Sequence, residues 1–86
     1  MKPQLAKGVR LRWDGVREQH VLLFPEGAAN LNPTAADVLA LCDGERTVET
    51  ISAELSERYS GADVRADVDK LLGAMAARGL VTDADA

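Results

Sequence analysis

The chain is poor in the residue types from which most enzyme sites are built. Among its 86 residues there is one histidine and one cysteine. A structural zinc site takes about four Cys or His ligands, and a catalytic one about three plus water, so His20 and Cys42 cannot form one. Nucleophilic catalysis needs a base held by a third group, whereas His20 stands at a strand entrance, where we expect a surface or cross-strand residue. No glycine-rich phosphate loop is present. We therefore expect no enzyme, no metal and no cofactor.

Long apolar segments are also missing. No stretch approaches the roughly 20 apolar residues that span a bilayer, and the first residues lack the apolar centre of a signal peptide. We expect a cytoplasmic protein with no membrane partner. Cys42 has no second cysteine with which to pair and lies among apolar residues, so we expect it to be a buried small hydrophobe.

What is present is the composition of a small folded domain. The chain is 47% apolar and 28% charged, and we expect a single domain over residues 1–86 with a small core. The net charge of -4 is unevenly spread, because residues 1–17 carry +4 and the remainder therefore carries -8. Such a split fits two differently charged faces, and it fits a solvated surface equally well.

Three short strands are predicted in the first part of the chain. Apolar and basic side chains alternate in the first, which is the period of a half-buried strand. The second is an apolar run ended by Pro25, which cannot donate to a strand ladder. The third has small side chains that leave its backbone approachable, and we place it at the sheet's edge. The predicted strands cover residues 9–13, 20–24 and 28–31.

The first two strands are predicted to be joined by a loop rather than by a tight turn. Asp14-Gly15 is typical of a two-residue turn. That register would set Arg12 opposite Arg17 and turn polar side chains toward the apolar face. We therefore expect a longer loop through about residues 14–19.

Three helices follow, each preceded by a residue that can cap it. Asn32 before Pro33 is a strong helix start, Thr47 can cap the second helix, and Asp63 can cap the third. Gly44 allows a left-handed residue after the first helix. The predicted helices cover residues 33–43, 48–59 and 64–78, so the predicted fold class is α+β, a three-stranded antiparallel sheet followed by three helices.

The third predicted helix has an unusually wide apolar stripe. Five of its side chains share an arc of about 100°, and small alanines flank them. One edge of the stripe can pack on the core while the other receives a ligand, although a core helix with no further role explains the stripe as well. The five residues are Val64, Val68, Leu71, Leu72 and Met75.

The second and third helices also resemble a helix-turn-helix, which makes a DNA-binding transcriptional regulator the alternative function. The last helix and its cap carry three aspartates against three basic residues, whereas phosphate binding needs a clear positive excess on the docking face. We expect no nucleic-acid partner.

Several segments of the chain resemble the PqqD family of pyrroloquinoline quinone (PQQ) biosynthesis proteins. The asparagine-proline-threonine helix start is the most specific of them, and the glycine-leucine pair near the end is the least. The likeness covers nearly the whole chain, through residues 31–39, 41–44, 47–48 with Ile51, 8–14, 20–27 and 79–81.

The resemblance implies a peptide chaperone with no chemistry of its own. PqqD proteins bind the precursor peptide PqqA and present it to the radical SAM enzyme PqqE, which cross-links a Glu and a Tyr of that peptide. Related domains, called RiPP recognition elements, are winged-helix-like and hold leader peptides between their third strand and third helix. Transferred to this chain, the implied peptide-binding residues are Ala28, Ala29, Asn30, Leu31, Arg65, Val68, Asp69, Leu71, Leu72 and Met75.

Two questions stay open at the level of sequence. Either Arg65 with Asp69 or Asp67 with Arg78 can form the polar rim of the groove, because the sequence does not say which flank of the third helix faces the peptide. The chain can be a monomer, or a homodimer that exchanges its N-terminal hairpin.

Overall fold

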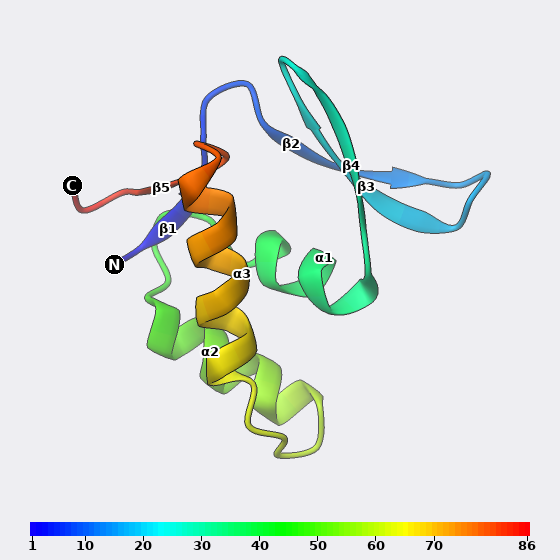
Figure 1. Ribbon diagram of the computed structural model, residues 1–86. Helices are drawn as coiled ribbons and strands as arrows, with labels where there is room; N and C mark the ends of the chain where they lie inside the picture. Colours follow the sequence, from blue (N-terminus) through cyan, green and yellow to red (C-terminus); the bar gives the residue numbers. More distant parts are fainter.

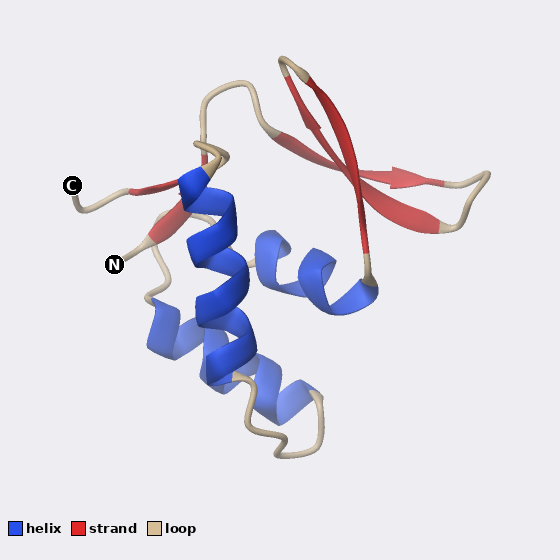
Figure 2. Cartoon of the chain, viewed as in Figure 1, coloured by secondary structure: helices blue, strands red, loops and turns tan.

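The computed structural model describes residues 1–86. Along the chain, a three-stranded sheet is followed by three helices (Figures 1 and 2). Strands β2, β3 and β4 form an antiparallel sheet in that order, which confirms the predicted α+β class. The strands are β1 (Pro3–Leu5), β2 (Arg10–Asp14), β3 (Gln19–Phe24), β4 (Gly27–Leu31) and β5 (Val81–Asp83), and the helices are α1 (Pro33–Ala40), α2 (Val48–Arg58) and α3 (Arg65–Ala77).

A second, two-stranded sheet joins the ends of the chain and was not predicted. β1 pairs antiparallel with β5, with Gln4 opposite Thr82, and Figure 1 shows the two termini side by side there. Strands of three residues are too short to show a period of two, so no pattern of apolar residues marked them. This sheet fixes the end of α3, because β5 follows that helix after only three residues.

The connection between β2 and β3 is a loop, as predicted. Trp13 pairs with His20 and Asp14 with Gln19, which leaves four residues in the loop rather than two. The Asp14 carboxylate accepts hydrogen bonds from the backbone N–H groups of Val16 and Arg17, at 3.0 and 3.3 Å. The same side chain that suggested a tight turn therefore closes a wider one.

The core lies between the inner face of the sheet and the three helices. α1 packs against all three strands of the sheet and against α2, and α2 packs against α3. Leu22 at the centre of β3, with Ile51 and Leu55 of α2, is completely buried. The outer face of the sheet has no helix against it (Figure 2).

The predicted capping residues are confirmed for the first two helices and corrected for the third. The Asn32 side chain accepts a hydrogen bond from Ala35 N–H at 2.8 Å, and Thr47 accepts one from Thr50 N–H at 3.1 Å. α3 begins after Val64, which makes no side-chain cap. Asp63 lies one residue earlier and binds Arg65 N–H at 3.1 Å.

The end of the first helix was predicted too late. α1 ends at Ala40, three residues before the predicted boundary, because the chain there turns to meet β1. Gly44 has φ +79° and donates its N–H to the carbonyl of Pro3 at 3.0 Å. A Cβ at this position would lie 2.9 Å from the side chain of Gln4. The glycine is therefore needed where the chain passes β1, not at the helix end.

Replacing the cap of α1 tests how the sheet is joined to the helices. We expect Asn32→Ala to lower the free energy of unfolding by about 0.5 to 2 kcal/mol, because Ala35 N–H loses its acceptor. Urea denaturation followed by circular dichroism measures this. Asn30→Ala is the matched control, since Asn30 is exposed on β4 and its side chain makes no hydrogen bond. Equal midpoints and slopes for the two variants would contradict the assignment.

Candidate functional site

The outer edge of β4 is free and uncharged. β4 pairs only with β3, and its residues make no backbone hydrogen bonds on the other side. Its sequence, Gly-Ala-Ala-Asn-Leu, contains no charge and no large side chain before the buried Leu31. The other edge of the sheet, β2, carries Arg10, Arg12 and Asp14. Charges on an edge strand oppose pairing with another chain, so β4 is the edge that can accept an additional strand.

A cavity lies where β4 ends, α1 begins and α3 passes. It has a volume of about 300 Å³ and an open mouth. α1 contributes its cap, its first turn and the buried Val38, and α3 contributes one carboxylate and one half-buried apolar side chain. The lining residues are Asn32, Thr34, Ala35, Val38, Asp67 and Leu71.

α3 also reaches the opposite end of β4. The guanidinium of Arg78, directly after the helix, lies 5.3 Å from the centroid of the Phe24 ring. Phe24 pairs with Gly27, the first residue of β4. α3 thus comes near Asn32, directly after β4, through Asp67 and Leu71, and near Phe24, opposite the first residue of β4, through Arg78.

The geometry shows which flank of α3 is turned toward each neighbour. Arg65 pairs with Asp69 at 3.1 Å and with Glu49 of α2 at 3.6 Å, so these two sequence-predicted residues lie on the flank nearest α2. Asp67 lies on the opposite flank, with the cavity. Periodicity could place these residues on two flanks but could not assign a neighbour to each.

The remaining sequence-predicted residues divide between the core and the surface. Val68 and Leu72 are buried in the core together with Leu31, while Leu71 and Met75 are half-buried against it. Ala28 and Asn30 are exposed, and Ala29 is half-buried. The structure thus brings Leu71 to the cavity at the end of β4, while Val68 and Leu72 anchor the helix beneath it.

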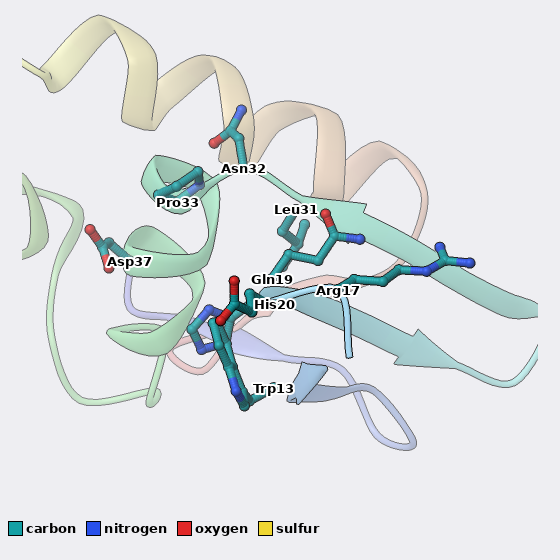
Figure 3. A pocket seen from close by; sticks show the side chains of 9 residues that line it. Trp13, Arg17, Gln19, His20, Leu31, Asn32, Pro33 and Asp37 are labelled. Atoms are coloured by element: carbon teal, nitrogen blue, oxygen red, sulfur yellow. The ribbon is translucent and has the colours of Figure 1, made fainter. Parts of the chain in front are cut away.

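A second and larger cavity was missed by the sequence reasoning. It has a volume of about 460 Å³ and lies between the β2–β3 loop and the first turn of α1. Figure 3 shows Trp13 and His20 side by side at this cavity, with Pro33 and Asp37 on the helix. The Trp13 and His20 rings meet edge to face with centroids 5.0 Å apart, which agrees with the prediction of a cross-strand histidine.

The same region exposes large apolar side chains. Trp13 is 55% exposed and Val16, at the loop tip, is 95% exposed. A third cavity, of about 260 Å³, lies beside Trp13 and is lined by Arg12, Asp14, Val21 and Leu23. The β2–β3 loop with Trp13 and the basic side chains of Arg12 and Arg17 is called the hairpin surface below.

Tyr59 and Cys42 are two titratable side chains with structural contacts. The Tyr59 hydroxyl donates to the Asp37 carboxylate, which joins α2 to α1, and this hydrogen bond raises the pKa of Tyr59. Burial, reinforced by the Asp43 charge, raises the pKa of the Cys42 thiol to about 11.

No three His, Cys, Asp or Glu side chains lie close enough together to hold a metal ion. No helix has the length and apolar character needed to cross a membrane.

The three-stranded sheet with its open β4 edge and the three helices form a winged-helix-like domain. The model of the family "Coenzyme PQQ synthesis protein D (PqqD)" matches residues 19–81. The chain belongs to the PqqD family, and the resemblance found in the sequence is confirmed.

Relatives and a solved structure support this membership. The chain is 52% identical over 56 residues to the "PqqA binding protein" of Klebsiella pneumoniae strain 342, covering 65% of this chain and 61% of that protein. It is thus matched to about three fifths of that relative's length. It is 43% identical over 76 residues to the "Bifunctional coenzyme PQQ synthesis protein C/D" of Methylorubrum extorquens, covering 86% of this chain and 20% of that one.

The solved structure is the solution NMR structure of the PqqD truncation of Methylobacterium extorquens PqqCD, described as a functional, stand-alone RiPP recognition element. The TM-score is 0.81 at 39% sequence identity, covering 93% of this chain and 87% of the other. The whole arrangement of sheet and helices is therefore shared.

The environment of Cys42 makes a prediction about its reactivity. Its thiol donates to the carbonyl of Val38 at 3.3 Å inside the core. A pKa raised from 9.0 to about 11 reduces the thiolate fraction at pH 8 by about a hundredfold. We expect Ellman's reagent to modify the native protein at least about a hundredfold more slowly than protein unfolded in guanidinium. Equal rates in the two states would show that the thiol is exposed.

Proposed function

We propose that this chain is a single peptide-binding domain, residues 1–86, that holds the precursor peptide PqqA during PQQ biosynthesis. Two neighbouring features support the proposal: the free, uncharged edge of β4, and the cavity between α1 and the Asp67–Leu71 flank of α3, which includes Asn32 directly after the strand. The space along that edge and this flank of α3 is called the groove. Membership of the PqqD family and the name of the Klebsiella relative support PqqA as the ligand.

The binding mode that fits this groove is strand addition. An extended peptide adds to an open sheet edge through main-chain hydrogen bonds, and adjacent pockets read its side chains. β4 offers unpaired N–H and C=O groups, and small side chains at Ala28 and Ala29 do not obstruct the approach. The 300 Å³ cavity at the end of the strand has room for one apolar side chain against Leu71 and Val38.

The proposed role is presentation and not catalysis. The domain would hold PqqA in extended form while the radical SAM enzyme PqqE carries out the cross-linking reaction. PqqA is made on ribosomes, so the proposal places the domain in the cytoplasm as well. In this scheme the domain needs two surfaces, one for the peptide and one for the enzyme. It needs no bound quinone or other cofactor.

The hairpin surface is our candidate for contact with PqqE. Tryptophan and arginine dominate the binding energy of protein interfaces, and here the only tryptophan of the chain is exposed between two cavities. The larger cavity shares Asn32 with the cavity of the groove. An enzyme docked on the hairpin surface would thus stand beside the end of a peptide lying along β4.

The alternative is a transcriptional regulator that binds DNA through α3. The exposed residues of that helix include Arg65 and Lys70, but Asp67 and Asp69 lie among them. A helix that enters the major groove needs an excess of positive charge there. A gel shift at low salt distinguishes the two functions, since a regulator would bind with an affinity that falls steeply as salt rises.

A carboxylate placed in the groove tests the peptide site. We expect Leu71→Asp to weaken PqqA binding by at least about tenfold, because the side chain lines the cavity where an apolar group of the peptide is desolvated. Isothermal titration with synthetic PqqA measures the affinity. Nitrogen-15 NMR should place the largest shifts of the wild-type protein on Gly27–Leu31 and on α3.

The matched control is Ala66→Asp, which adds the same carboxylate to an exposed position on another face of α3. It should bind PqqA like the wild-type protein. Leu71→Ala serves if the aspartate disturbs the fold. Wild-type protein whose β4 and α3 resonances stay unmoved at saturating PqqA would refute the groove as the binding site.

The role of the hairpin surface is tested by measuring PqqE binding and PqqA binding separately in one variant. We expect Trp13→Ala with Arg12→Ala to weaken PqqE binding by about tenfold or more and to leave PqqA affinity within about twofold. Arg65→Ala, which removes an arginine from the flank of α3 nearest α2, is the control. Binding of PqqE that is unchanged in the double variant, measured by surface plasmon resonance, would exclude this surface.

A further inference from the structure

Opposite charges stand at the two ends of the groove wall on α3. Asp67, Leu71, Ala74 and Arg78 follow the spacing i, i+4, i+7 and i+11, which sets them in one line along a helix. The chain has six ion pairs within 4.0 Å, and neither Asp67 nor Arg78 takes part in any of them. Arg65 and Asp69, which lie four residues apart on α3, are paired with each other.

Each of these charges lies near one end of β4. Asp67 lines the cavity with Asn32, directly after the last residue of the strand. Arg78 lies over the ring of Phe24, which is paired with the first residue of the strand. Stacking on an aromatic ring holds a guanidinium in place and leaves its N–H groups free to bind a carboxylate.

The separation of the two charges matches the length of the strand. Eleven residues of helix rise about 16 Å at 1.5 Å each. An extended peptide covers that distance in about five residues, at about 3.3 Å each. β4 itself is five residues long. A peptide strand lying along β4 would therefore bring side chains about five residues apart to Asp67 and to Arg78.

The helix dipole gives a purely structural reason for the same two residues. An aspartate in the first turn and an arginine at the end of a helix are both favoured by it. That reason requires only that the charges lie near the helix ends. It does not require them to share the flank that lines the groove, or to be without ion-pair partners. The two explanations also differ in what they predict, because the dipole affects stability and not the choice of peptide.

We infer that the groove selects its peptide by the order of two charges, a basic side chain at the Asn32 end beside Asp67 and an acidic side chain about five residues away beside Arg78. The inference rests on the proposed function, since it concerns the peptide bound along β4. Main-chain hydrogen bonds to a strand edge do not depend on side chains. The two terminal charges fix which stretch of a longer peptide lies in the groove.

Charge-reversal pairs test the inference. Asp67→Lys and Arg78→Glu are each titrated calorimetrically with wild-type PqqA and with PqqA peptides in which one charged residue at a time is reversed. We expect each protein variant to raise the Kd for wild-type PqqA by about three- to thirtyfold, as attraction becomes repulsion at a partly exposed pair. One reversed peptide position should restore the affinity of Asp67→Lys. A different one, four to six residues away, should restore that of Arg78→Glu.

The controls separate this inference from the proposed function and from a structural role. Glu57→Lys on α2 and Lys70→Glu on α3 reverse one acidic and one basic charge at exposed positions without ion-pair partners, and should leave the Kd within about twofold. The neutral variants Asp67→Asn and Arg78→Gln serve if a reversal prevents folding, with smaller rises in Kd expected. Wild-type protein that does not bind PqqA would refute the proposed function itself. Normal wild-type binding with unchanged Kd in the Asp67 and Arg78 variants, or no rescuing peptide position, would overturn the charge-order inference alone.

Discussion

The change from strand to helix at Asn32 is the constraint on which the rest of the structure depends. Pro33 cannot donate a backbone hydrogen bond, so it ends β4 and suits the first position of α1. The Asn32 side chain then binds the N–H of Ala35. Because the chain turns within one residue, α1 passes under the sheet that it has just left. No further segment continues along β4, and its outer edge stays free.

The position of α3 follows from contacts at both of its ends. At its start, Arg65 is tied to Glu49 of α2, and at its finish β5 pairs with β1. Val68 and Leu72 bury the face between these ends. Rotation about its axis would break both the ion pairs and this packing. The flank with Asp67 and Leu71 is therefore held on the side of α1 and β4 by contacts made elsewhere.

The features that could be predicted are those set by residues close together in the sequence. Asn32 and Pro33 predicted the start of α1, and alternating apolar and basic side chains predicted β2. The like charges of Arg12 and Arg17, which a two-residue turn would place opposite each other, argued against a tight hairpin. Long-range pairing was out of reach. β1 and β5 have three residues each and lie at opposite ends of the sequence. A side chain at position 44 would collide with Gln4 of β1, so the need for glycine there also depends on this distant strand. Periodicity predicted which side chains of α3 form its apolar face. It could not predict which flank of the helix lies against α2 and which against α1, because those are contacts between distant segments. The cavity between Trp13 and α1 was missed for the same reason.

An exposed strand edge is a liability that proteins reduce with charges, proline or bulges. The two edge strands of this sheet differ in charge. β2 carries Arg10, Arg12 and Asp14, whereas Gly27–Leu31 carries no charge at all. In an 86-residue protein with a small core, leaving one edge unprotected invites association with other copies. A peptide bound along this edge, as proposed, would remove that risk, and it would stabilise the fold by mass action because an intact strand edge exists only in the native state. The lack of protection on β4 therefore agrees with the proposal that this edge receives a peptide strand.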